Sequence, residues 1–143
     1  MRARWWIEAL VEEEIFDLVA DEWRFRSDLV RDVAYEVQPL EVRRSTHASV
    51  ARALQDQRDR GAPVPAATIA GHFQRGGRLQ DAIDAYETAA QESMQRGQLE
   101  EGRGQLDTAL DLLARLATES EVSSEDIQHR EVGLRLLRGF IAV

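Results

Sequence analysis

One sequence repeat constrains the fold of this chain more than any other feature. Four positions at helical spacing recur 20 residues later, so that Leu79, Ala82, Tyr86 and Ala89 correspond to Leu99, Gly102, Leu106 and Ala109. A glycine turn precedes each set, at Gly77 and at Gly97. Small residues let neighbouring helices approach closely, and the large ones fill the space between them. The repeat therefore predicts a mainly α fold built from stacked antiparallel helical hairpins.

Helical patterning extends from about residue 40 to the end of the chain. Residues 61–65, Gly-Ala-Pro-Val-Pro, interrupt it and are the best linker candidate. A short helix with Ile69, Ala70 and Phe73 inward should follow and end at Gly76. The helix before the linker is expected to bury one face, made of Leu40, Arg43, His47, Val50, Ala51 and Leu54. We expect about six helices in the whole chain.

Residues 15–26 have a different period. A short apolar run at 15–19 is followed by Trp23, Phe25 and Ser27, which alternate with arginines. Such alternation is typical of a strand with one buried face, so a small β-hairpin is predicted around an Asp-containing turn. Asp28 is expected to cap the helix that follows. The predicted core face of that helix consists of Leu29, Val30, Val33, Ala34 and Val37.

The composition excludes several classes of chemistry. All 18 basic residues of the 143-residue chain are arginine, and lysine and cysteine are absent. A lysine-dependent phosphate loop, a Schiff-base enzyme, a cysteine nucleophile, a thiolate zinc site and a disulfide are therefore excluded. The formal net charge of −8 is not typical of a surface that binds phosphate groups.

The histidines and carboxylates do not form a recognisable catalytic or metal site. His47, His72 and His129 are 25 and 57 residues apart, so no two share a metal-binding motif. We expect His47 and His72 to be packed between helices and His129 to lie on the surface. The acidic runs, including residues 12–14 and 100–101, should be solvated helix faces. No catalytic residue, cofactor or metal ligand is predicted, and the chain is not expected to be an enzyme.

Two stretches resemble a known family. The family has an aromatic-x-Phe-x-His-x-Leu pattern, which an Ala-Tyr pair follows. Residues 23–35 match this pattern at Phe25, Leu29, Ala34 and Tyr35, although Ser27 replaces the histidine. His47 matches a later histidine, with Thr46 in place of the preceding leucine. Residues 69–73 and 76–82 are similar to the family's first tetratricopeptide-like helix pair. The chain thus resembles the region after the nucleotide-binding part of STAND-type ATPase regulators, as in LuxR-tailed transcription regulators and ATPase-linked class III adenylate cyclases.

This resemblance implies an organisation and a role. Residues 1–60 would be a winged-helix remnant plus a connecting helix, and residues 64–143 a tetratricopeptide-like segment. The nucleotide-binding and effector parts of such regulators lie outside this region, so the chain is expected to be an excised domain or a short separate reading frame. The implied function is that of a non-catalytic interaction and regulatory module that relays signals within or between such ATPases.

Partner binding is predicted at two places. Phe73, Arg78 and Tyr86 are expected near a concave groove, with arginines at its rim. The last helix carries apolar residues in almost every direction, so Leu136, Leu137, Phe140 and Ile141 are predicted to contact another chain or further repeats of a parent protein. The alternative is that this helix folds back and buries itself on the helix at residues 99–117. A homo-oligomer is among the possible assemblies.

Two other functions remain as alternatives. DNA binding through the winged-helix remnant would use Arg24, Arg26 and Arg31, although Glu22, Asp28 and Asp32 beside them oppose it. A hydrolase that uses paired carboxylates, such as Asp107 and Asp111, is the least favoured. The chain has no run of 18 apolar residues, and the apolar stretch before Glu8 is too short for a signal peptide. We therefore expect a cytoplasmic protein that does not bind membranes.

Overall fold

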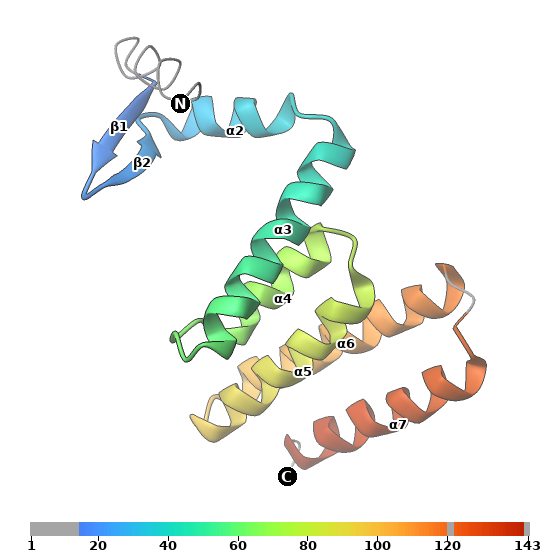
Figure 1. The fold of residues 1–143 in the computed structure, drawn as a ribbon. Helices are drawn as coiled ribbons and strands as arrows, with labels where there is room; N and C mark the ends of the chain where they lie inside the picture. Colours follow the sequence, from blue (N-terminus) through green and yellow to red (C-terminus); the bar gives the residue numbers. More distant parts are fainter. Residues whose placement is uncertain (1–14, 120–121, 142–143) are drawn as a thin grey trace. The chain divides into compact units, whose positions relative to one another are not determined.

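The structure is a computed structural model, and it describes residues 15–119 and 122–141 (Figure 1). This part of the chain is mainly helical, with six helices and a small antiparallel sheet that precedes them, as the sequence predicts. The chain forms two compact units, residues 1–43 and 44–143. The expected linker at residues 61–65 therefore lies within the second unit. The acidic run at residues 12–14 and the apolar stretch before Glu8 lie outside the described residues.

The first unit contains a β-hairpin. Strand β1 (Phe16–Val19) pairs antiparallel with β2 (Glu22–Phe25), with Phe16 opposite Phe25 and Val19 opposite Glu22. The two residues of the turn, Ala20 and Asp21, have φ angles of 51° and 64°. Positive φ at both central residues gives a turn whose twist matches that of the flanking strands. The predicted hairpin is thus confirmed.

Helix α2 (Asp28–Glu36) follows the hairpin, and two predictions about it are wrong. The capping residue is Ser27, whose Oγ accepts a hydrogen bond from the backbone N–H of Val30 at 3.4 Å, and Asp28 is the first helical residue. The predicted core face is not buried, since no residue of α2 is buried and Leu29 is 72% exposed. Amphipathic spacing marks a face that can be covered, but it does not supply the element that covers it.

Five helices make up the rest of the described chain: α3 (Leu40–Asp59), α4 (Ala66–Arg75), α5 (Leu79–Gln95), α6 (Leu99–Glu119) and α7 (Ser124–Ile141). Helix α3 begins in the first unit and continues into the second. Within the second unit, α5 packs against α4 and α6, and α6 packs against α7 (Figure 1). Gly77 and Gly97 have φ angles of 69° and 75°, and each lies in the turn between two helices. The left-handed conformation there suits glycine and ends each helix.

Six of the eight repeated positions are buried in the second unit. Ile69, Ile83, Leu106, Leu113 and Leu134 are the largest apolar side chains that are almost completely buried. A Cβ atom added to Gly102 would lie 3.2 Å from the carbonyl oxygen of Ala90, so this small residue allows α5 and α6 to pack closely. The two sets of the repeat are not equivalent everywhere, because Leu79 is buried and Leu99 is exposed.

The buried face of α3 differs from the predicted one. Ala48 and Ala51 are buried and Leu54 packs against the core, whereas Leu40 and Val50 are exposed. The reason is that small residues mark the side on which α4 approaches. A Cβ atom added to Gly76 would lie only 2.8 Å from the backbone nitrogen of Ala48.

Candidate functional site

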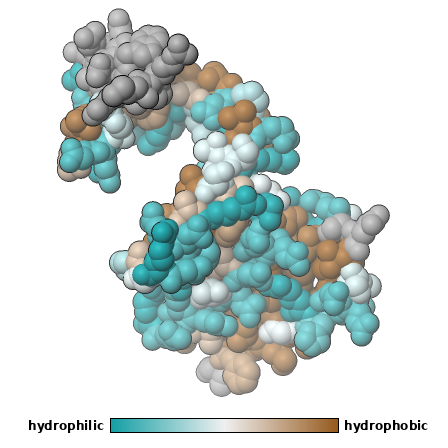
Figure 2. Space-filling model, in the orientation of Figure 1, coloured by the Kyte–Doolittle hydropathy of each residue, from teal (hydrophilic) through white to brown (hydrophobic). Residues whose placement is uncertain are grey.

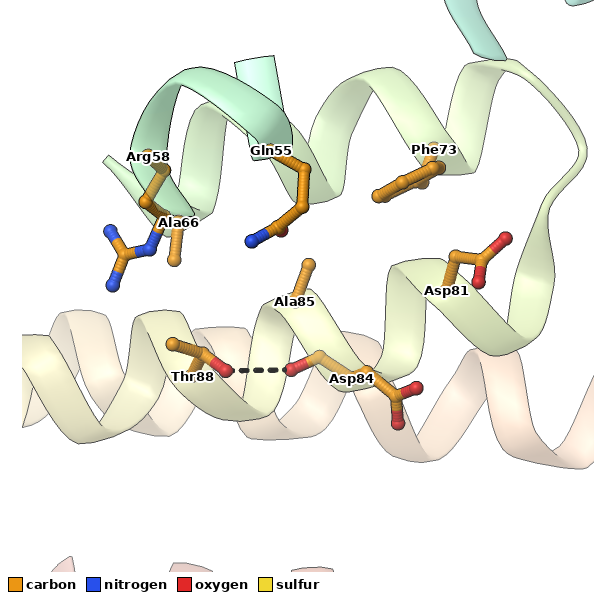
Figure 3. Close-up of a pocket in the computed structure, with 8 residues that line it drawn as sticks. All are labelled: Gln55, Arg58, Ala66, Phe73, Asp81, Asp84, Ala85 and Thr88. Carbon is orange, nitrogen blue, oxygen red and sulfur yellow. Dashed lines mark hydrogen bonds between the residues drawn. The ribbon is translucent and has the colours of Figure 1, made fainter. Parts of the chain in front are cut away.

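The first predicted binding region contains a cavity of about 230 Å³ between α3, α4 and α5. Phe73 is only 7% exposed and is part of the core, and its ring lies at the wall of this cavity. Figure 3 shows Phe73 of α4 and Ala85 of α5 facing one another, whereas the carboxylate of Asp84 points away from the cavity. The other residues that line it are Gln55, Arg58, Ala66, Asp81 and Thr88.

Polar groups at this cavity already have partners within the chain. Arg58 donates from Nη1 to the carbonyl oxygen of Val64 at 2.7 Å and forms an ion pair with Glu92. Asp81 is paired with Arg78 at 2.9 Å, and Asp84 is paired with Arg130 of α7. The charged groups around the cavity are therefore compensated. What the arrangement offers is an apolar wall for a small side chain.

The structure does not bring Phe73, Arg78 and Tyr86 into one cavity. Arg78 is exposed and lines a separate hollow beside Leu116 and Glu119. Tyr86 is half-buried, and its hydroxyl donates a hydrogen bond to Oε1 of Gln74 at 2.7 Å. Burial raises the pKa of Tyr86, although the charge of Arg75 acts in the opposite direction. The sequence prediction placed these three residues near a groove, and the structure gives each of them a different environment.

Helix α7 has an inner face that packs on α6. Leu134 and Ile141 are buried there, and Leu137 packs against the same core. Arg138 of α7 forms an ion pair with Asp107 of α6, and Arg130 reaches Asp84 and Glu87 of α5. Leu137 and Ile141, two of the four predicted docking residues of α7, are therefore used inside this chain.

The opposite face of α7 carries an apolar stripe that nothing in the described chain covers. Val132, Leu136 and Phe140 follow one another at four-residue steps and are 57%, 61% and 77% exposed. We call these three residues the outer stripe. Gly139 stands beside it, and a Cβ atom there would meet no atom within 4 Å. Figure 2 shows one face of the helical unit, on which apolar patches interrupt a largely hydrophilic surface. The outcome thus lies between the two predicted alternatives, because one face of α7 packs on α6 and the opposite face is exposed.

The three arginines of the DNA-binding alternative form ion pairs within the first unit. Arg24 pairs with Glu22 and Arg26 with Asp17, each at 3.4 Å. Arg31 contacts Asp28 at 2.9 Å and Asp32 at 2.8 Å. The hydrogen bond to Asp32 raises the pKa of Arg31, with further contributions from the charges of Asp32 and Asp28. Neighbouring carboxylates thus compensate the charge that phosphate binding would need.

Two of the three histidines meet in the structure. Nδ1 of His47 on α3 lies 2.9 Å from Nδ1 of His72 on α4. Burial is the main cause that lowers the pKa of each, and the charge of Arg75 lowers both further. His129 is exposed on α7. Within residues 15–119 and 122–141, no group of three or more histidines, cysteines or carboxylates could hold a metal ion.

Sequence reasoning missed the pairs that join distant parts of the second unit. The His47–His72 contact and the Arg58–Glu92 ion pair link residues 25 and 34 positions apart. No local pattern signals them, since each requires knowledge of which helix faces which. The apolar excess of α7 was detectable in the sequence, although the sequence did not separate the outer stripe from the face that packs on α6.

None of the helices in the part of the chain that the structure describes is long and apolar enough to cross a membrane. Comparison of the chain with family models, with curated proteins and with solved structures gave no match.

Proposed function

We propose that this chain is a non-catalytic protein-interaction and regulatory module whose docking element is helix α7. The observation that carries the proposal is the outer stripe, Val132, Leu136 and Phe140, exposed on a helix whose other face is anchored in a packed core. Exposed apolar surface of this kind is costly to leave in water and is typical of interaction sites. An anchored helix also presents its side chains in a fixed arrangement, which reduces the entropic cost of binding.

The arrangement of the helices supports a tetratricopeptide-like segment. Consecutive helices α4, α5, α6 and α7 pack each on the next, and close approach depends on small residues such as Ala82, Gly102 and Ala109. In stacked repeats each unit covers the apolar face of its neighbour. In this arrangement the outer stripe is the face on which a further helical element would pack.

The proposed partner class follows from the resemblance to STAND-type ATPase regulators. The motif residues Phe25, Leu29, Ala34 and Tyr35 lie in β2 and α2, which is where such a regulator would end its winged helix. We propose that the chain is part of such a regulator or binds one, and that it relays signals without carrying out bond chemistry.

Capture from native extract tests the proposal. The intact chain is compared with a variant that carries Leu136→Gln and Phe140→Ser, which changes two residues of the outer stripe and no buried residue. A matched control carries Gln128→Ser and His129→Ser, two exposed polar positions on the same helix. We expect the intact chain and the control to retain a protein with a STAND-type ATPase domain, and the stripe variant to lose it. Equal capture by all three chains, or no such ATPase with any of them, would overturn the proposal.

A further inference from the structure

Two imidazole rings meet where α3 passes α4. Nδ1 of His47 and Nδ1 of His72 are 2.9 Å apart, and the ring centroids are 5.1 Å apart. This is the length of a hydrogen bond, so one ring must donate its Nδ1 proton while the other accepts through a lone pair. The contact therefore needs at least one ring whose Nδ1 is not protonated.

The backbone holds the pair in place. Ala48, next to His47, is buried, and the space between its backbone and Gly76 is too small for a Cβ atom. The carbonyl oxygen of His72 accepts the backbone N–H of Gly76 at 2.9 Å, which fixes His72 to the same turn. The packing of α3 on α4 thus holds the two residues that carry the rings next to one another.

The electrostatic surroundings oppose a positive charge on the pair. Burial is the largest cause that lowers the pKa of His47, and the charges of His72 and then of Arg75 lower it further. Arg44 of α3 lies beside Gly77 at the end of α4. From α5, the hydroxyl of Tyr86 reaches α4 and donates to Gln74, and burial raises the pKa of this tyrosine. One effect acts the other way, because the last turn of α4, where His72 lies, favours a cation.

We propose that His47 and His72 form a proton-operated latch that holds the first turns of α3 in the second unit against the end of α4. A first proton from solvent on His72 leaves its Nδ1–H donating to His47. A second proton, on His47, removes the acceptor and places two cations in contact beside Arg75. The hydrogen bond then breaks, and α3 loses its polar link to α4.

The latch lies at a meaningful point of the chain. The boundary between the two compact units falls at Arg43 and Arg44, one helical turn before His47. Opening the latch loosens the turn of α3 by which the chain passes from the first unit into the second. Protonation would thereby regulate the segment that joins the two units.

The sign of the pH dependence follows from the lowered pKa values. Both histidines have pKa values below the ordinary 6.5, so the unfolded chain takes up protons before the folded chain does. The stability that the pair contributes is fully present above about pH 6.5. It is lost as the pH falls from there through the lowered pKa values of the folded state.

Hydrogen exchange of the intact chain, with chelator in the buffer, tests the proposal. After correction for the intrinsic rates, amides of residues 44–54 should lose protection as the pH falls from about 7.5 to about 5, because the pair takes up its second proton below the ordinary histidine pKa. Amides in the centre of α6 should lose less. His47→Asn should abolish this loss, because the asparagine Oδ1 accepts the same bond and does not titrate.

Two further variants keep the test decisive. Arg75→Gln removes a positive charge that lowers the pKa of both histidines, so it should move the loss of protection to higher pH, while His129→Asn should behave as the unmodified chain. If the α3 amides lose no protection in the unmodified chain, or lose as much in His47→Asn, the latch does not exist. If His47→Asn fails to fold, the Arg75→Gln variant decides. An unchanged pH midpoint for the loss of protection in that variant contradicts the proposal equally.

Discussion

The hairpin with α2 and the helices from α3 to α7 have equally regular secondary structure, but they are stabilised in different ways. No residue among 15–43 is buried, whereas every helix from α4 to α7 contributes buried side chains. The first region is specified by local devices, namely the turn at Ala20 and Asp21 and the Ser27 cap. The second region is specified by contacts between residues far apart in the sequence. Local signals therefore decide which elements form, and long-range packing decides which of them are stable.

The largest difference should appear when the same substitution is made in both regions. Leu106→Ala removes a completely buried side chain from the core of α6 and should lower the free energy of unfolding by about 2–5 kcal/mol. Leu29→Ala, at a position that is 72% exposed, should change it by less than about 0.5 kcal/mol. Urea unfolding followed by circular dichroism measures both. Similar losses for the two variants would mean that the first unit has a core of its own.

A partly buried ion pair should matter more than an exposed one. Glu92 accepts from Arg58 and from the backbone N–H of Ala66 at the start of α4, and the side chains of Glu92 and Arg58 are both partly buried. Glu92→Gln should cost about 1–3 kcal/mol, because Arg58 would keep its charge without a compensating carboxylate. Glu22→Gln, which removes the partner of exposed Arg24, should be nearly neutral. Thermal unfolding of the two variants at low and high salt would distinguish them, and equal effects would contradict the comparison.

Two glycines of the second unit should respond in opposite directions to the same change. Gly76→Ala places a Cβ atom 2.8 Å from the backbone nitrogen of Ala48 and should cost about 1–3 kcal/mol. Gly71→Ala, within α4 and with no atom near the new Cβ, should stabilise by about 0.5–1 kcal/mol. The melting temperature should therefore fall in Gly76→Ala and rise in Gly71→Ala. If Gly76→Ala also stabilises, the close approach of α3 and α4 is wrong.

The smallest expected effect concerns Tyr86. Tyr86→Phe removes the hydroxyl that donates to Gln74 at 2.7 Å and should cost about 0.5–1.5 kcal/mol. A double-mutant cycle with Gln74→Ala isolates this contribution from the loss of packing. A coupling energy of zero would show that the two side chains do not interact in solution.

Much of the fold was predictable from the sequence where the signals are local. The hairpin followed from the alternation at Trp23 and Phe25, and the ends of α4 and α5 from Gly77 and Gly97, because these signals act within a few residues. The buried face of α3 was predicted only in part: Ala51 is buried as expected, but apolar periodicity placed Val50 inward, whereas the approach of α4 covers Ala48. The histidine pair needed the relative placement of two helices, which no local pattern contains.

The candidate site was predictable in part for the same reason. The apolar excess of α7 identified the helix, and Leu136 and Phe140 do lie on its exposed face. Leu137 and Ile141 could not be separated from them by sequence, because the side on which α6 packs decides which apolar side chains are covered. Phe73 was expected near a groove, but it belongs mainly to the core.

The central claim is that the outer stripe of α7 binds another protein. The most direct measurement is the affinity of the chain for the ATPase regulator captured from extract, determined for the unmodified chain and for the variant with Leu136→Gln and Phe140→Ser. We expect a loss of at least about thirtyfold, because two exposed apolar anchors are each expected to contribute more than about 1 kcal/mol. Circular dichroism should be unchanged. Equal affinity of the two chains would contradict the account.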